Sequence, residues 1–201
     1  MSDMSLNSLL LQTIRASAQE SAAVQSSIAE PSLSSAIMRT AEECCRTWSQ
    51  QGTVFIIGNG GSAAEAQHLA AELVGRFERD NCLAAQALTT DTSILTALAN
   101  DFSYDEVFER QVRALVKKND ILIAMSTSGN SEGILRAVEQ AHNKGALTIG
   151  LTGKSGGRLR EQCDICLQIP ATRTCRIQEG HLTVIHILCE LIERMLEAEN
   201  H

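Results

Sequence analysis

Short runs of apolar residues alternate with longer stretches of helical spacing from residue 52 onward. The short runs predict buried strands, and the stretches between them predict helices. The predicted strands are Val54–Ile57, Ala84–Leu88, Ile121–Met125, Ala146–Leu151 and Ile165–Ile169. The predicted helices are Ala63–Arg76, Thr92–Ala99, Tyr104–Lys117, Ser131–Lys144, Gly157–Gln162 and Arg176–Glu199.

The predicted strands are apolar throughout and do not alternate between apolar and polar positions. Strands of this kind are buried on both faces, and strands that alternate with helices form parallel sheets. The pattern therefore predicts an α/β fold with a doubly wound, parallel, five-stranded sheet. Ligands of such sheets bind at the carboxyl ends of the strands.

The first fifty residues have a different pattern. Residues 5–28 and 33–51 have the apolar spacing of two weakly amphipathic helices, separated at Pro31. A chain of 201 residues has the length of one α/β domain. We therefore expect one domain over residues 1–201, with a helical extension at 1–51 and the α/β core and C-terminal helix at 52–201.

The last predicted helix is apolar nearly all round. A helix without a fully polar face is buried on more than one side. It either joins the N-terminal helices in a bundle between subunits or crosses the sheet under cover of its own chain, and we favour the homo-oligomer. The apolar positions are Ile177, Leu182, Val184, Ile185, Ile187, Leu188, Leu191, Ile192, Met195 and Leu196.

Composition narrows the function classes. Aromatic residues make up only 3% of the chain and the net charge is −7, which argues against stacking on single-stranded nucleic acid and against non-specific DNA or membrane binding. The N-terminal residues lack the features of a signal peptide, and no apolar run reaches the length of a membrane span. The seven cysteines are an odd number, so we expect reduced thiols and a cytoplasmic protein.

A glycine turn, Gly58–Ser62, lies between the first strand and its helix. Its backbone N–H groups face the start of the helix, where anions bind well. His68 and Glu72 follow on that helix, four residues apart on one face. They suit an acid/base pair or two ligands of one metal ion, although such pairs are also common on helix surfaces.

A second turn after the third strand reads Ser-Thr-Ser-Gly-Asn-Ser, residues 126–131. Four hydroxyl groups beside the N-terminus of a helix predict a neutral phosphate cradle. The turn has neither the Walker pattern nor the dinucleotide pattern. Helix capping is the alternative, but a cap accounts for only one or two such residues.

The last helix carries Gln178, Glu179, His181 and His186 near its start. His186 has apolar neighbours in sequence, and alone it would be typical of a core histidine. Glu179 shares its helix face with His186, whereas His181 points away from it. Gln178 is eight residues before His186, or roughly 12 Å along a regular helix.

Two cysteine pairs have a structural interpretation. Cys163 and Cys166 form a single C-x-x-C whose second cysteine lies in a predicted strand, so we expect a buried pair and no zinc or redox site. Cys44 and Cys45 lie in a predicted helix and are also expected to be structural.

The motifs together resemble those of the sugar isomerase (SIS) domain family and, within it, the bacterial phosphoheptose isomerases. The resemblance covers essentially the whole chain. It implies a flavodoxin-like fold, a homotetramer with active sites between subunits, and interconversion of sedoheptulose 7-phosphate and D-glycero-D-manno-heptose 7-phosphate for the bacterial envelope. The motifs in order are GNGGS, H-x-x-x-E, NDF, STSGNS, LTGKSGG and RIQE followed by HLTVIH.

The resemblance also implies roles for individual residues. Glu72 is implied as the base and His186 as the acid of an enediol mechanism. Some members hold one zinc ion per site at the positions of His68, Glu72, Gln178 and His186. The implied substrate-binding residues, besides Glu72, are Asn59, Gly60, Gly61, Asn100, Asp101, Ser126, Thr127, Ser128, Ser131 and Gln178.

Two features qualify this resemblance. Gln178 and His186 are too far apart on one regular helix for easy ligation of one ion, so we expect either a ligand from a neighbouring subunit or a distorted helix start. Some relatives carry an aspartate where this chain has Cys175, with Thr174 beside it, which leaves a supporting polar role there open.

Alternative functions remain within the same family. The non-catalytic DnaA initiator-associating proteins have this fold but lose the catalytic glutamate and histidine, and this chain has both Glu72 and His186. Isomerases of hexose or pentose phosphates would have a similar phosphate cradle. A sugar-phosphate sensor is less favoured, because no DNA-binding region is fused to the domain.

Overall fold

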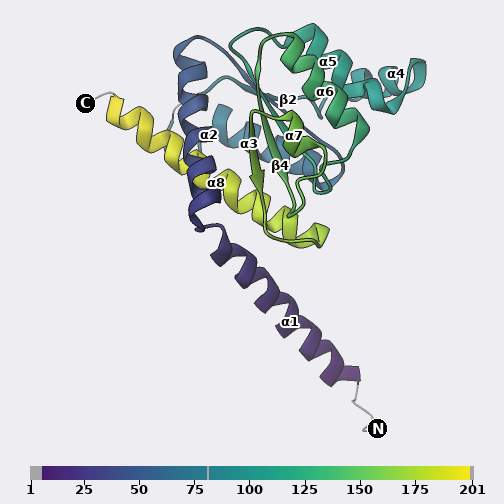
Figure 1. Ribbon diagram of the computed structural model, residues 1–201, viewed down its shortest axis with the longest axis vertical. Coiled ribbons are helices and arrows are strands. Elements are labelled where there is room, and N and C mark those ends of the chain that lie inside the picture. Colours follow the sequence, from purple (N-terminus) through teal and green to yellow (C-terminus); the bar gives the residue numbers. More distant parts are fainter. Residues whose placement is uncertain (1–5, 81, 200–201) are drawn as a thin grey trace.

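The computed structural model describes residues 6–80 and 82–199. Its centre is a five-stranded parallel sheet in the order β2-β1-β3-β4-β5, which confirms the predicted fold class (Figure 1). The strands are β1 (Val54–Gly58), β2 (Ala85–Ala87), β3 (Ile121–Met125), β4 (Leu147–Thr152) and β5 (Ile165–Gln168).

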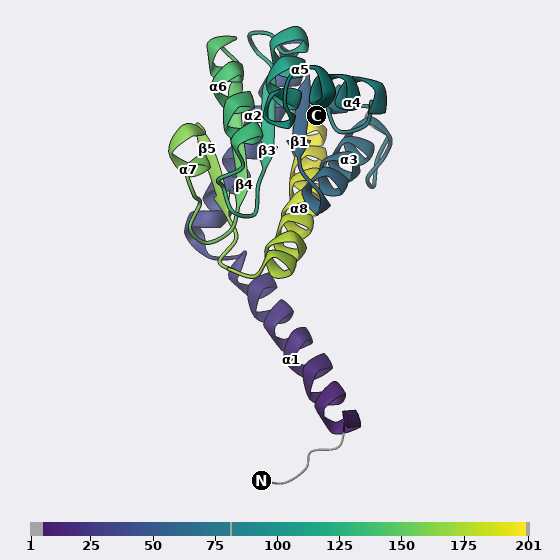
Figure 2. The same ribbon diagram turned by 90° about the vertical axis from the view of Figure 1, so that its right-hand side faces the viewer.

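Helices cover both faces of the sheet (Figure 2). On one face lie α2 (Pro31–Ser49), α3 (Gly61–Val74) and α8 (Thr174–Glu199). On the other lie α4 (Thr92–Asp101), α5 (Val107–Leu115), α6 (Glu132–Asn143) and α7 (Leu159–Gln162). Successive strand residues point to opposite faces, so Ile56 packs in the first core and Ile57 in the second. This two-sided burial explains why the strands are apolar throughout.

Most element bounds differ from the predictions by only a few residues, but one predicted helix is divided. Tyr104–Glu106 is a 3₁₀ turn (η1), and α5 then covers Val107–Leu115. The helix ends before the predicted Lys117, because Val116 is extended. Pro31 is the first residue of α2, where its fixed φ and missing N–H cost nothing.

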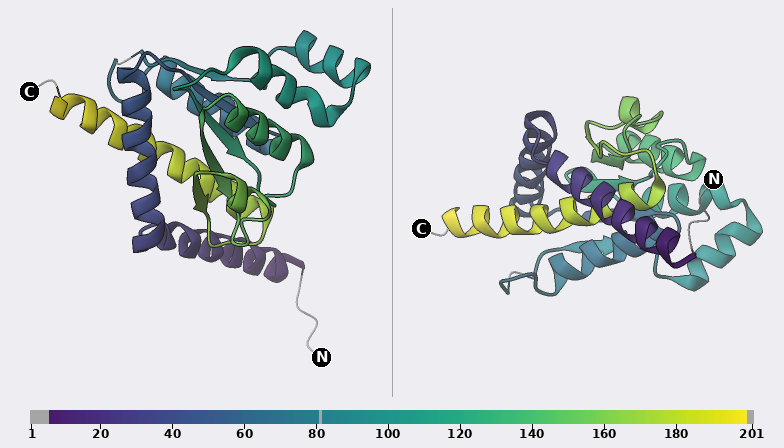
Figure 3. Two further views of the ribbon diagram at one scale, coloured as in Figure 1. Left: turned by 45° about the horizontal axis from the view of Figure 1, so that its top comes forward. Right: turned by 90° about the horizontal axis from the view of Figure 1, so that it is seen from below.

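α1 (Leu6–Ser27) leads away from the body of the molecule (Figures 1 and 3). The predicted helix began at residue 5, which lies outside the described residues. Large apolar side chains on this helix are exposed, with Leu6 at 69% and Ile14 at 65%. Because α1 extends away from the core, its own chain leaves most of these apolar side chains uncovered.

α8 lies on the sheet between α2 and α3, and Val184, Ile185 and Leu188 are buried there by the same chain. On this side, α8 therefore crosses the sheet and is covered by its own chain, which is the alternative to a helix bundle between subunits. Leu182 is 38% exposed on another side. The homo-oligomer stays a prediction. Among the described residues, no helix combines the length and apolar character needed to cross a membrane.

Candidate active site

Three turns meet at the carboxyl edge of the sheet, after the neighbouring strands β1, β3 and β4. Asn59 in the first turn donates from Nδ2 to the Ser131 hydroxyl at the end of the second, at 3.1 Å. The N–H of Gly153 in the third turn donates to the carbonyl of Thr127 at 3.1 Å. Residues that are far apart in sequence therefore form one polar surface where the fold predicts a ligand.

The glycine turn after β1 depends on residues without a side chain. Gly60 has φ of +57°, in the left-handed region that glycine adopts without strain. A Cβ atom on Gly61 would overlap the side-chain amide of Gln178. The missing Cβ thus allows the first turn of α3 to lie directly against the start of α8.

The hydroxyl turn after β3 is ordered by its own side chains. Ser126 Oγ accepts the N–H of Gly129, and Ser128 Oγ accepts the N–H of Asn130, each at 3.2 Å. Ser131 is the N-cap residue of α6, but within the described chain its side chain makes no capping bond. Capping therefore does not explain Ser131, and its hydroxyl faces Asn59 instead.

α3 and α8 run side by side in the same direction, and polar residues face each other along the pair. His181 is fully buried, and its Nδ1 lies 3.4 Å from Glu65 Oε2 while its Nε2 lies 3.3 Å from the carbonyl of Thr152. These contacts connect both helices to the end of β4. The facing pairs in chain order are Gly61 with Gln178, Glu65 with His181, and His68 with His186.

His68, Glu72 and His186 form a cluster on these two helices. The Nε2 atoms of the two histidines are 2.8 Å apart, and His68 Nε2 is 3.5 Å from Glu72 Oε1. One ligand atom from each residue lies within 4.8 Å of the others. Two imidazoles and a carboxylate are the donors of catalytic zinc sites, which keep a further position open. The donor set therefore fits a zinc ion.

Two further side chains border this cluster. The Phe77 ring stacks on His186, with centroids 5.8 Å apart and an interplanar angle of 28°. Burial, together with the charges of Glu72 and Glu193, raises the pKa of the Cys189 thiol to about 12. At neutral pH the Cys189 thiol is therefore protonated.

Gln178 is not part of the three-residue cluster. Its amide lies beside Gly61, two helical turns before His68 on α3, and α8 is helical from Thr174 onward. A distorted helix start therefore does not bring Gln178 to His186, and its ligand role stays a prediction. Thr174 and Cys175 are exposed at the first turn of α8.

Asn100 and Asp101 lie at the end of α4 and are exposed. Asn100 Nδ2 donates to Asp101 Oδ1 at 2.8 Å, and no hydrogen bond in the described chain joins either residue to the other implied site residues. Their neighbour Tyr104 does make such a bond, since its hydroxyl donates to Asn59 Oδ1 at 2.8 Å.

The sequence motifs do not mark Tyr104, Phe77 or the Glu65–His181 pair as parts of the site. Tyr104 is the single tyrosine of the chain and closely follows the NDF motif, and this position is the one feature of the sequence that could have indicated its place in the site. Phe77 lies in a loop and has no periodic pattern to mark it. Glu65 precedes His68 by less than one helical turn, but only the fold pairs it with His181.

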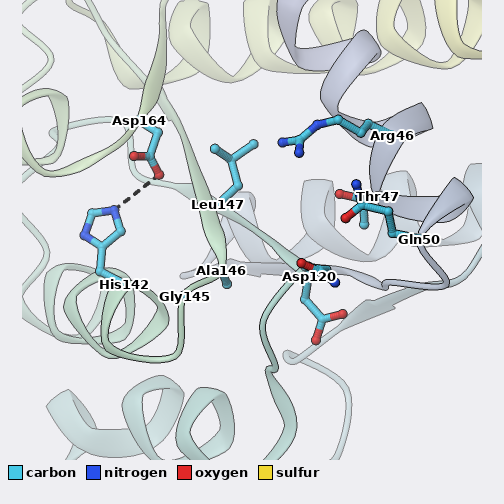
Figure 4. A pocket seen from close by; sticks show the side chains of 10 residues that line it. Arg46, Thr47, Gln50, Asp120, His142, Gly145, Ala146, Leu147 and Asp164 are labelled. Carbon is cyan, nitrogen blue, oxygen red and sulfur yellow. Dashed lines mark hydrogen bonds and ion pairs between the residues drawn. The ribbon is translucent and has the colours of Figure 1, made fainter.

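The amino edge of the sheet has a hollow of about 280 Å³ (Figure 4). Asp120 accepts two backbone N–H groups there, from Thr53 at 2.9 Å and Lys117 at 2.7 Å. Asp164 Oδ2 accepts the N–H of Thr148 at 2.8 Å and lies 3.3 Å from His142 Nε2. Both carboxylates already accept hydrogen bonds from backbone N–H groups, so the hollow does not form a second candidate active site.

The two cysteine pairs differ in burial: Cys44 and Cys45 are buried, whereas Cys163 and Cys166 are half-buried, so the expected burial of the C-x-x-C pair is only partial. All seven are free, and all lie in the described part of the chain. Burial, together with neighbouring Cys166, raises the pKa of Cys163 to about 12. Cys44 is buried, and burial also raises its pKa strongly. Thiols held protonated in this way are inert.

The fold and the carboxyl-edge site define an SIS domain. The family model described as SIS domain matches residues 18–153, more than half of the chain. This agrees with the three turns and the parallel sheet order described above.

Comparison with individual proteins identifies the group within this family. A phosphoheptose isomerase of Roseiflexus sp. (strain RS-1) is 51% identical over 164 residues, covering 81% of this chain and 83% of the relative. The structure of phosphoheptose isomerase GmhA from Neisseria gonorrhoeae matches with a TM-score of 0.87 and 41% identity, covering 92% of this chain and 99% of that one. A phosphoheptose isomerase structure from Francisella tularensis has the same TM-score and 37% identity, covering 92% and 98%. The chain belongs to the phosphoheptose isomerase family.

Proposed function

We propose that this chain is an aldose–ketose isomerase that interconverts sedoheptulose 7-phosphate and D-glycero-D-manno-heptose 7-phosphate. This step would begin heptose synthesis for lipopolysaccharide or other envelope glycans. The observation that carries the proposal is the cluster of Glu72 and His186 on α3 and α8, two helices that begin at the carboxyl edge, where the hydroxyl turn lies. A carboxylate, an imidazole and a phosphate cradle are the groups that this reaction requires.

The reaction moves a proton between C1 and C2 of the open-chain sugar. In the ketose-to-aldose direction, the Glu72 carboxylate takes a proton from C1, which gives an enediol, and returns it to C2. His186 gives a proton to the oxygen on C2 and then takes the proton from the oxygen on C1, so that it returns to its starting state. The two residues lie on adjacent helices in one cluster, so both reach the two carbons of one substrate.

The phosphate belongs at the second turn in this proposal. Ser126, Thr127, Ser128 and Ser131 surround the first turn of α6, whose N–H groups have no partner inside the helix. Asn59 to Gly61 then bind the sugar beside the phosphate. Asn100 and Asp101 are proposed to contact the substrate from α4.

We propose one zinc ion per site, held by His68, Glu72 and His186. When bound, it would polarise the carbonyl and enediolate oxygens of the substrate. Gln178 would be a fourth ligand only if it comes from a neighbouring subunit, because in its own chain it lies at Gly61.

We further propose a homotetramer in the cytoplasm. The exposed apolar side chains of α1, such as Leu9 at 48% and Leu10 at 51%, support an interface between subunits. The free cysteines support a reducing compartment. Light scattering of the purified protein measures the number of subunits directly.

The decisive experiment is an assay with sedoheptulose 7-phosphate for the wild type, Glu72→Gln and His186→Gln. Loss of a positioned acid or base reduces kcat by about 10²–10⁴-fold. We expect both variants to lose turnover and still bind the substrate in calorimetry. His142→Gln is the matched control, because His142 lies on α6, which covers the other face of the sheet from α3 and α8.

The same experiment distinguishes the alternatives. A wild type that binds sugar phosphate but turns over none, and instead binds a replication initiator, would establish the DnaA initiator-associating function. Faster turnover of a hexose or pentose phosphate would assign a different isomerase. Full activity of either variant would remove its residue from the mechanism, and a chelator arm tests the need for zinc.

A further inference from the structure

A chain of hydrogen bonds crosses the site and is not explained by the proposed reaction. The Tyr104 hydroxyl donates to Asn59 Oδ1 at 2.8 Å, and Asn59 Nδ2 donates to Ser131 Oγ at 3.1 Å. We propose that Tyr104 is a positioning residue, which orients the Asn59 amide so that the Ser131 hydroxyl is free to donate to a phosphate oxygen. This inference rests on the proposed function.

The direction of the bonds carries the inference. A phenol donates to the oxygen end of an amide, so the NH₂ group of Asn59 must face the other way, toward Ser131. A hydroxyl has one proton to donate, and Ser131 accepts from Asn59 without giving that proton to it. Its proton therefore points outward, where an anion at the start of α6 would accept it.

The place of Tyr104 also indicates a polar role for its side chain. The residue is 60% exposed, so it contributes little to the core. Its backbone is nevertheless held close to the hydroxyl turn, because η1 packs on the first turn of α6. A Cβ on Gly133 of α6 would lie only 3.3 Å from Asp105 Cα. The packing of η1 fixes the backbone, and the hydroxyl fixes Asn59.

Tyr104→Phe removes only the hydroxyl and leaves the ring. Without that donor, the Asn59 amide is free to flip and accept the Ser131 proton, which takes the proton away from the ligand. We expect inorganic phosphate to bind about 3- to 10-fold more weakly, as for the loss of one neutral hydrogen bond. The KM for sedoheptulose 7-phosphate should rise by a similar factor, with kcat unchanged.

Ser131→Ala distinguishes a positioning role of Tyr104 from a merely structural one. If Tyr104 acts through Ser131, adding Tyr104→Phe to Ser131→Ala should weaken phosphate binding no further. The control is Phe102→Leu, which alters an exposed aromatic residue of the same loop outside the hydrogen-bond chain. This control should leave phosphate binding at the wild-type level.

Several outcomes would overturn the inference. The first is that Tyr104→Phe binds phosphate as tightly as the wild type, or lowers kcat alone. The second is that Tyr104→Phe weakens phosphate binding equally in the wild type and in Ser131→Ala, or that Phe102→Leu weakens it as much as Tyr104→Phe does. The third is that the wild type binds no phosphate. A wild type that binds phosphate with the expected coupling but isomerises nothing would refute the proposed function and support the role of Tyr104.

Discussion

The two edges of the sheet carry similar side chains in opposite situations. At the amino edge, Asp120 and Asp164 accept backbone N–H groups that would otherwise be unpaired. On α3 and α8, the helices that begin at the carboxyl edge, His68 and His186 face each other across 2.8 Å, and Glu72 lies beside them. Carboxylates and histidines occur at both edges, so composition alone does not separate them.

The difference lies in the partners of the polar groups. A carboxylate that accepts backbone N–H groups stabilises a loop, and its ligand positions are occupied. Side chains that contact mainly one another from different helices are held by packing, and a ligand can replace the contacts between them. The hollow at the amino edge is therefore structural, whereas the carboxyl edge has the groups for chemistry.

The sharpest test of this comparison replaces one glycine at each edge. Gly61→Ala places a Cβ against the Gln178 amide, so this side chain must leave its position beside the glycine turn. A displacement of about 1 Å in an active site lowers turnover by about 10²-fold. We expect a loss of that size in the isomerase assay, with the protein still folded by circular dichroism.

Gly145→Ala is the matched variant at the amino edge. Gly145 has φ of +76°, and a Cβ there would meet only the Lys118 side chain at 3.6 Å. Alanine at this φ costs roughly 1–2 kcal/mol of stability. Activity per folded molecule should not change. Equal losses of activity in both variants would break the distinction between the edges.

The second prediction concerns the structural role of Asp164. Its Oδ2 accepts both the N–H and the hydroxyl of Thr148, each at 2.8 Å, and Thr148 is fully buried. Asp164→Ala leaves the N–H of Thr148 without this acceptor, whereas the hydroxyl still lies 2.7 Å from His142 Nε2, and the loss should lower the free energy of unfolding by about 1–3 kcal/mol. Urea denaturation measures the change. If kcat fell while stability held, the amino edge would have a role in catalysis.

The fold could be predicted from the sequence because the patterns of apolar residues that indicate strands and helices are local and recur along the chain. The apolar runs at Val54 and Ile121 fit strands buried on both faces, and each is followed by a turn and a helix. The division at Tyr104–Glu106 was missed, because the same residues have acceptable helical spacing and only the packing of η1 on α6 selects the 3₁₀ turn.

The site was less accessible from sequence. Motif spacing put His68 and Glu72 on one face, but His186 joins them only because α3 and α8 run in parallel on the same side of the sheet. Helix geometry correctly separated Gln178 from His186, yet only the structure puts Gln178 at Gly61. Contacts between distant segments, such as Tyr104 with Asn59, have no periodic signal in a single sequence.

The smallest expected effect is a pH dependence at the amino edge. Burial acts to raise the pKa of Asp164, but hydrogen bonds from Thr148 and the charge of His142 outweigh it, so the pKa lies below its ordinary value of 3.8. The unfolded chain therefore binds more protons than the folded one near this pH, and the ionised carboxylate stabilises the fold above pH 4 or so. That contribution should disappear as the pH falls through the lowered pKa.

Asp164→Asn isolates this effect, because the amide keeps an oxygen acceptor and cannot ionise. The stability difference between the wild type and this variant should stay below about 1 kcal/mol, since a side chain that is 40% exposed is screened by solvent. Urea midpoints measured from pH 6 down to pH 3 should converge. Parallel curves over that range would mean that the Asp164 charge does not contribute, and that the neutral hydrogen bonds to Thr148 alone hold the amino edge together.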